Sequence, residues 1–125
     1  MSIETEVDPG RQLVHVTVSG TFTQTDLFEA IQGVVEHPEF SSGFRIRSDH
    51  RAVETPLTPV QARAMVDLIE RYPALRGTRW AVIVGSLASY GMLRLASAHA
   101  ERVPVHIEVF EDPAEADAWL DQSVG

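Results

Sequence analysis

The sequence of 125 residues contains no cysteine and no lysine. Without cysteine, the protein cannot form disulfides, use a thiolate nucleophile or bind zinc through sulfur. Without lysine, Schiff-base chemistry on a side-chain amine is excluded. The sequence also has no apolar run close to the roughly 20 residues that a membrane-spanning helix needs. We therefore expect no integral membrane contact.

Positive charge is scarce, because ten basic residues stand against 18 acidic ones and give a net charge of -8. Nucleic acid binding requires clustered cations, so a nucleic acid partner is not expected. Residues 1–10 are acidic and lack the apolar core of a signal peptide. Together with the absence of cysteine, this favours a cytoplasmic protein.

The charges are unevenly distributed. Arg45, Arg47 and Arg51 lie close together against the single acid Asp49. Residues 101–121 instead carry one arginine and a run of acids: Glu101, Glu108, Glu111, Asp112, Glu115, Asp117 and Asp121. We interpret this acidic run as a solvated helix face.

Motifs for metals, cofactors and catalysis are lacking. The five histidines show no HxxxH or HxH spacing, so neither a metal site nor a cofactor is predicted. No Walker, GxGxxG or GxSxG pattern follows any expected strand. A serine triad of Ser86, His50 and Asp49 is conceivable but is not favoured.

The hydrophobic pattern predicts one domain over residues 1–125, with five strands and four helices in the order ββαβαβαβα. Asp8-Pro9-Gly10 indicates a turn between two antiparallel strands, and strands separated by helices must be parallel. The fold class is therefore α/β with a five-stranded mixed sheet. The expected strands cover residues 3–7, 13–18, 44–49, 80–84 and 105–110, and the helices begin at Thr23, Thr58, Ser86 and Asp112.

The strand over residues 80–84 is apolar without alternation, which predicts a central strand covered on both faces. The helix that follows, over residues 87–100, is apolar around much of its circumference. A second stripe that includes Met92 and Leu95 needs another cover, either the neighbouring helices or a second subunit. A homodimer is therefore one expectation.

The segment AVIVGSLASYGMLRLASAHAE, followed by VHIEVFEDPAEADAWL, resembles the SpoIIAA-like proteins. These are related in fold to STAS domains and more distantly to CRAL-TRIO lipid-transfer domains. The resemblance covers nearly the whole chain and includes Tyr90-Gly91-Met92 with Arg94, and Asp49 with Arg51. It implies a small bacterial cytoplasmic domain that binds or regulates without catalysis, through protein contacts or a small anionic or lipid-like ligand.

The anti-anti-sigma relatives in this group use a phosphorylatable serine at the start of the helix after the third strand. Here the corresponding segment, residues 48–58, is longer and has neither a glycine nor paired serines. This departure argues against a phosphorylation switch at that position.

Polar residues follow the third and fourth strands, and ligands bind beyond the carboxyl ends of parallel strands. We therefore expect one ligand-binding rim with Asp49, Arg51, Ser86 and Tyr90, and with Arg94 one turn beyond. In the simpler interpretation Ser86 only caps a helix and Asp49–Arg51 is a local ion pair. The alternative function is a small enzyme or a lipid-binding protein that uses this rim. A pocket reaching into the core favours that alternative, whereas a shallow rim favours a binding domain.

Overall fold

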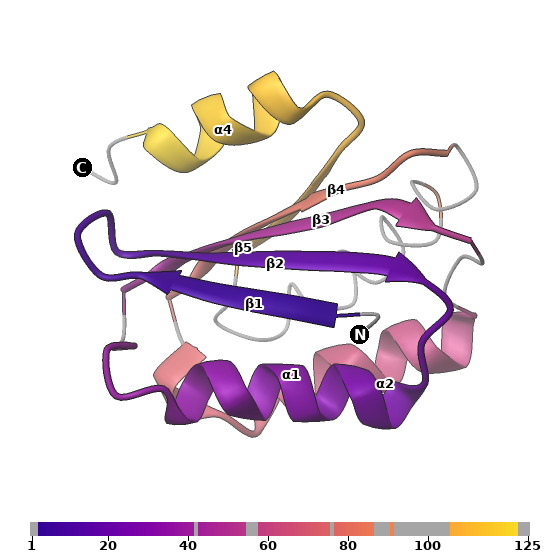
Figure 1. Cartoon of the computed structure of the whole chain (residues 1–125), viewed down its shortest axis with the longest axis horizontal. Coiled ribbons are helices and arrows are strands. Elements are labelled where there is room, and N and C mark those ends of the chain that lie inside the picture. Colours follow the sequence, from indigo (N-terminus) through magenta and orange to yellow (C-terminus); the bar gives the residue numbers. More distant parts are fainter. Residues whose placement is uncertain are drawn as a thin grey trace.

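The computed structural model describes residues 3–41, 43–54, 58–75, 77–86, 91 and 106–122. They contain one five-stranded sheet in the order β1-β2-β3-β4-β5 (Figure 1). β1 pairs antiparallel with β2, and the remaining pairs are parallel. The predicted α/β mixed sheet is thus confirmed. The strands are β1 (Ile3–Asp8), β2 (Leu13–Gly20), β3 (Arg45–Val53), β4 (Arg79–Ile83) and β5 (His106–Phe110).

Helices cover both faces of the sheet. α1 (Gln24–Glu36) and α2 (Pro59–Glu70) lie on one face, and α4 (Pro113–Asp121) lies on the other (Figure 1). A short 3-10 turn, η1 (Pro73–Leu75), precedes β4. The described residues therefore contain three α-helices rather than the four expected. The helix expected over residues 87–100 lies outside them except for Gly91, and the proposed dimer stripe lies outside with it.

The helices begin at the caps that the sequence predicts. The Thr23 hydroxyl accepts a hydrogen bond from the Asp26 amide at 3.1 Å, and the Asp26 carboxylate accepts one from the Thr23 amide at 2.8 Å. Thr58 and Gln61 form the same reciprocal box at α2. The Asp112 carboxylate accepts from an amide in the first turn of α4. These side chains satisfy amides that have no partner within the helix.

The third strand is longer than predicted. We expected this strand to end at Asp49, but β3 continues to Val53. β3 is longer because the neighbouring strand β2 extends to Gly20. The last residues of β2 pair with Ala52 and Val53 of β3 after a register shift. Because side chains alternate along a strand, His50 and Arg51 point to opposite faces of the sheet.

The core has two layers. The larger layer lies between the sheet and α1 with α2, and the smaller one lies between the sheet and α4. Trp80, Val82 and Val84 belong to the first layer, while Ala81 and Ile83 belong to the second, and all five are buried. This confirms the prediction of a central strand covered on both faces.

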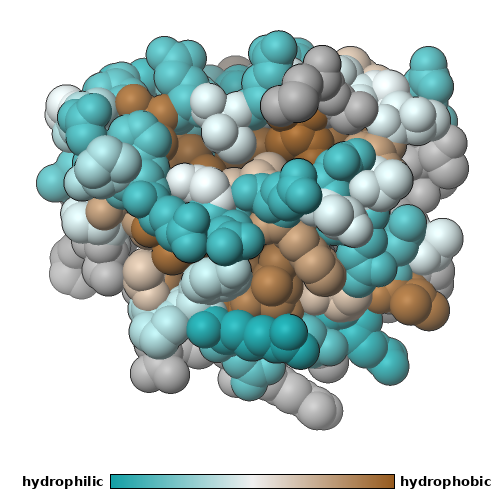
Figure 2. All heavy atoms as spheres, turned by 60° about the horizontal axis from the view of Figure 1, so that its bottom comes forward, coloured by the Kyte–Doolittle hydropathy of each residue, from teal (hydrophilic) through white to brown (hydrophobic). Residues whose placement is uncertain are grey.

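Figure 2 brings the helical side of the larger layer forward, and hydrophobic side chains are visible there between hydrophilic ones. Val60 on α2 is the large hydrophobic side chain that is most exposed among the described residues, at 76%. None of the described helices is long and apolar enough to cross a membrane.

Candidate functional site

The alternation of β3 divides its polar residues between the two faces of the sheet. One set lies on the side of α4: Arg45, Arg47, Asp49 and Arg51. The other set lies on the side of α1 and lines a cavity there: Ile46, Ser48 and His50. The residues that the sequence placed in one short polar segment therefore belong to two separate environments.

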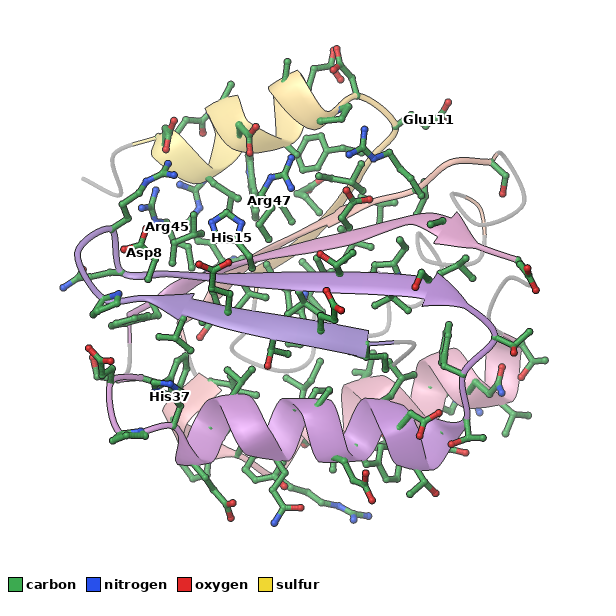
Figure 3. All side chains as sticks on the ribbon, in the orientation of Figure 1. Asp8, His15, His37, Arg45, Arg47 and Glu111 are labelled. Carbon is green, nitrogen blue, oxygen red and sulfur yellow. The ribbon has the colours of Figure 1, made fainter. Side chains whose placement is uncertain are left out.

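Arg45 and Arg47 attach α4 to the sheet (Figure 3). The Arg47 Nε donates to the Asp117 carboxylate at 2.7 Å. The Arg45 Nη1 donates to the backbone carbonyl of Leu120 at 2.8 Å and lies 3.3 Å from Asp121. The acidic run is thus not only a solvated face, since two of its acids pair with the basic segment. These contacts give both arginines a structural role.

Arg79 makes a third contact with the end of α4. Its Nη1 donates to the carbonyl of Gln122 at 2.8 Å, and its guanidinium lies 4.4 Å from the centre of the Trp119 ring. A cation over an indole face is attracted by the ring's quadrupole. The same Trp119 ring packs against Phe110 of β5. This end of the sheet is therefore occupied by packing and attachment of α4.

Asp49 and Arg51 form a two-pronged ion pair at the other end of β3. Arg51 Nε donates to Oδ1 at 3.0 Å, and Nη2 donates to Oδ2 at 2.7 Å. The hydrogen bonds from Arg51 hold the pKa of Asp49 below its usual value, against the opposing effect of burial. The same hydrogen bonds raise the pKa of Arg51. The local ion pair of the simpler interpretation is therefore present, with both groups charged.

The carboxyl end of β4 lies at the same end of the sheet as the Asp49–Arg51 pair. A Cβ added to Gly85 would lie 3.0 Å from the backbone oxygen of Arg51, so the two backbones lie close together and a side chain at this position would crowd β3. Ser86 follows directly and is exposed. Arg51 and Ser86 are thus at one end of the sheet. Tyr90 and Arg94 lie outside the described residues, and the complete rim stays a prediction.

The surface next to the ion pair is a shallow hollow. It is lined by Thr17, Val18, Asp49, Arg51 and Ala52. Two of these residues come from β2 and three from β3, so the hollow lies over the strand pair where the register shifts. It matches the shallow rim that the sequence associates with a binding domain.

On the opposite face, Ser48 and His50 form a buried polar pair that sequence reasoning missed. The Ser48 Oγ lies 2.6 Å from the His50 Nε2, and the two residues are 2% and 7% exposed. Burial lowers the pKa of His50 to about 4, although the charge of Asp49 acts in the opposite direction. The histidine is therefore neutral at pH 7. Continuing the alternation from Ile46 by four residues would have predicted this burial.

The position of His50 contradicts a triad with Ser86 and Asp49. Asp49 and His50 are consecutive residues of one strand, so their side chains lie on opposite faces of the sheet. His50 is hydrogen-bonded to Ser48 instead. The physical reason is the longer β3, because a strand fixes the alternation that a loop would not.

A cavity of about 30 Å³ lies between the sheet and α1. Apolar side chains from α1 and four strands, Trp80 among them, make most of its wall, and the polar lining residues are Thr5, Ser48 and His50. The Nε1 of Trp80 is buried and has no hydrogen-bond partner within the described structure. Among the described residues, no cluster of three or more His, Asp or Glu side chains is placed to hold a metal ion.

The comparisons with known proteins bear on the fold. The chain is similar to the crystal structure of an uncharacterized protein from the DUF3478 family, with a SpoIIAA-like fold, from Shewanella loihica PV-4. The TM-score is 0.63 at 18% identity, over 94% of this chain and 91% of that one. No family model matches the sequence, and no curated protein matches it. The protein thus has a SpoIIAA-like fold, as the sequence resemblance implied.

Proposed function

We propose that this protein is a non-catalytic binding or regulatory domain of the SpoIIAA-like and STAS type. Its binding surface is the rim formed by Asp49, Arg51 and Ser86, extended by Tyr90 and Arg94. The ligand is a small anionic or amphipathic molecule, or the matching group of a partner protein. The observation that carries the proposal is the position of Arg51, which lies against Gly85 at the carboxyl ends of β3 and β4.

The chemistry of this rim suits recognition. The Asp49 carboxylate accepts hydrogen bonds from Nε and Nη2 of Arg51. The Arg51 guanidinium has five N–H donors in all, and the side chain is 49% exposed. Arg51 is therefore held in one orientation while part of it faces solvent, which favours bidentate contact with a carboxylate or phosphate. The Asp49 carboxylate can accept from a hydroxyl or ammonium group of the same ligand.

The same pair makes catalysis at the rim unfavourable. An effective general base has a pKa near the working pH, but Arg51 moves the pKa of Asp49 further below neutrality. The buried Ser48–His50 pair lies on the other face of the sheet and cannot assist a reaction at the rim. These two observations support a binding domain over a small enzyme.

A lipid-binding protein is the second candidate, because the cavity beneath α1 reaches into the core. Its size argues against an acyl chain. The cavity measures about 30 Å³, whereas sites for drug-sized ligands measure about 300–1,000 Å³. A bound lipid chain would require α1 to move away from the sheet.

The test is a titration followed by amide resonances, with inorganic phosphate and dodecyl phosphate as probes. We expect saturable shifts at Arg51, Gly85 and Ser86, and a loss of binding in Arg51→Ala. Arg63→Ala is the matched control, since Arg63 is an exposed arginine on α2. Equal affinity in the two variants would contradict the proposal. Native mass spectrometry of freshly purified protein would show a co-purified ligand or a dimer mass.

A further inference from the structure

The outer edge of β1 pairs with none of the described strands. β1 is the first strand in the sheet order, so one of its backbone edges bonds to β2 and the other faces away from the sheet (Figure 1). Its pairing with β2 is regular from Ile3 to Asp8, without a bulge, and its six residues include no proline. Proline and bulges are common means of preventing an exposed edge from pairing. The backbone of β1 can therefore pair with another strand over its full length.

The side chains of β1 alternate between an acidic row and an apolar row. Glu4, Glu6 and Asp8 lie on the side of α4, as Figure 3 shows for Asp8. Ile3 and Val7 instead pack into the core on the side of α1. Glu4 and Glu6 are exposed, and neither has an ion-pair partner among the described residues. This edge thus presents two carboxylates that are not neutralised by the fold.

An open hollow of about 530 Å³ lies beside this strand. Its lining residues come from β1 and β2: Ile3, Glu4, Thr5, Glu6, His15 and Thr17. Because these include residues from both sides of β1, the hollow reaches around the strand edge and is not confined to one face of the sheet. α4 packs on β3, β4 and β5, at the other side of the sheet from this edge. Space for an additional strand is therefore present next to β1.

The charges along β1 indicate which strand would fit. If a second copy continued the sheet through β1, directly opposite residues would point to the same side, so acids would lie opposite acids. Like charges in these positions destabilise strand pairing, and the net charge of -8 adds to the repulsion. A strand with Arg or Lys at alternate positions would instead place cations opposite Glu4 and Glu6. The edge is thus complementary to a basic segment and not to itself.

We propose that the outer edge of β1 binds an extended basic segment of a partner protein by strand addition. The backbone of this segment continues the sheet, and its basic side chains face Glu4 and Glu6. The alternate side chains are apolar and lie on the side of Ile3 and Val7. In this mode of recognition, backbone hydrogen bonds supply affinity and alternate side chains supply specificity. The surface does not include Arg51, so the inference is independent of the ligand proposed for the rim.

The first experiment uses the unaltered full chain and the peptide acetyl-Arg-Val-Arg-Val-Arg-Val-amide. Binding is followed from the amide resonances of residues 3–8 and from their hydrogen exchange. We expect saturable shifts and slower exchange with this peptide, and neither with the peptide in which Glu replaces each Arg. A third peptide is N-methylated at every residue, so it keeps the positive charges and loses its backbone N–H donors. Equal affinity for the methylated peptide would indicate charge attraction alone and overturn strand addition.

The second experiment compares two double variants of equal net charge. Glu4→Gln with Glu6→Gln removes the carboxylates of the edge, whereas Glu70→Gln with Glu115→Gln removes exposed carboxylates on α2 and α4. We expect the first pair of substitutions to weaken binding of the basic peptide about fivefold relative to the second pair. Equal affinities would overturn the role of Glu4 and Glu6. A dimer mass with protection of residues 3–8 in the absence of peptide would assign the edge to a second copy and also overturn the proposal.

Discussion

The buried His50 predicts a specific dependence of stability on pH. Burial lowers its folded-state pKa from 6.5 to about 4. Between pH 6.5 and about 4, His50 is therefore protonated in the unfolded chain but neutral in the folded chain. Stability that derives from the neutral imidazole is complete above pH 6.5 and is lost as the pH falls through about 4.

The size of the stability loss follows from the difference between the unfolded and folded pKa values of His50. One pKa unit corresponds to about 1.4 kcal/mol, so the whole interval corresponds to about 3 kcal/mol. About 2 kcal/mol of this should be lost between pH 7 and pH 5. Asp49 also has a lowered pKa, but its contribution is lost only as the pH falls below the usual value of 3.8. The range from pH 7 to pH 5 thus separates the effect of His50 from that of Asp49.

The assay is urea unfolding at pH 7, 6 and 5, with the free energy of unfolding extrapolated to water. We expect the decrease in the wild type to be largely absent in His50→Gln, which keeps a polar group for Ser48 but cannot titrate. His106→Gln is the control, since His106 is exposed on β5. It should retain the wild-type decrease. The same pH dependence in His50→Gln as in the wild type would refute the argument.

Three further predictions concern packing and association. Val82→Asp should destabilise by about 3–5 kcal/mol because it places an unpaired carboxylate in the core, whereas Val60→Asp at an exposed helix position should leave the melting temperature nearly unchanged. A double-mutant cycle on Arg47 and Asp117 should give a coupling of about 0.5 kcal/mol that decreases in 1 M NaCl, since Asp117 is half exposed; zero coupling at low salt would contradict the attachment of α4 by this pair. A homodimer that buries the second stripe of residues 87–100 remains a prediction, and a monomer mass by light scattering at high concentration would count against it.

Sequence patterns predicted the sheet well because its determinants are local. The Asp8-Pro9-Gly10 turn defines the hairpin, the two capping boxes define the starts of α1 and α2, and the apolar run before Gly85 defines the central strand. The parallel strands lie in the sheet in the same order as along the chain, as successive strand–helix units predict. Each of these features depends on residues that are close in sequence.

The site was less predictable because its determinants are not local. The length of β3 depends on the pairing of Ala52 and Val53 with Ser19 and Gly20, which precede them by more than thirty residues. The role of Arg45 and Arg47 depends on α4, which lies more than sixty residues further along. Arg45, Arg47 and Arg51 are close in sequence and were therefore interpreted as one basic segment. In the folded protein, Arg45 and Arg47 bind α4, whereas Arg51 pairs with Asp49 at the rim.

The extended β3 also determines how a binding experiment at the rim can be interpreted. Ser48 and His50 point toward α1, while Asp49 and Arg51 point away from it, although the four residues are consecutive. Arg51→Ala therefore changes the rim and leaves the side chains that line the cavity beneath α1 unchanged. A loss of phosphate binding in this variant, with an unchanged free energy of unfolding, would be attributable to the rim alone.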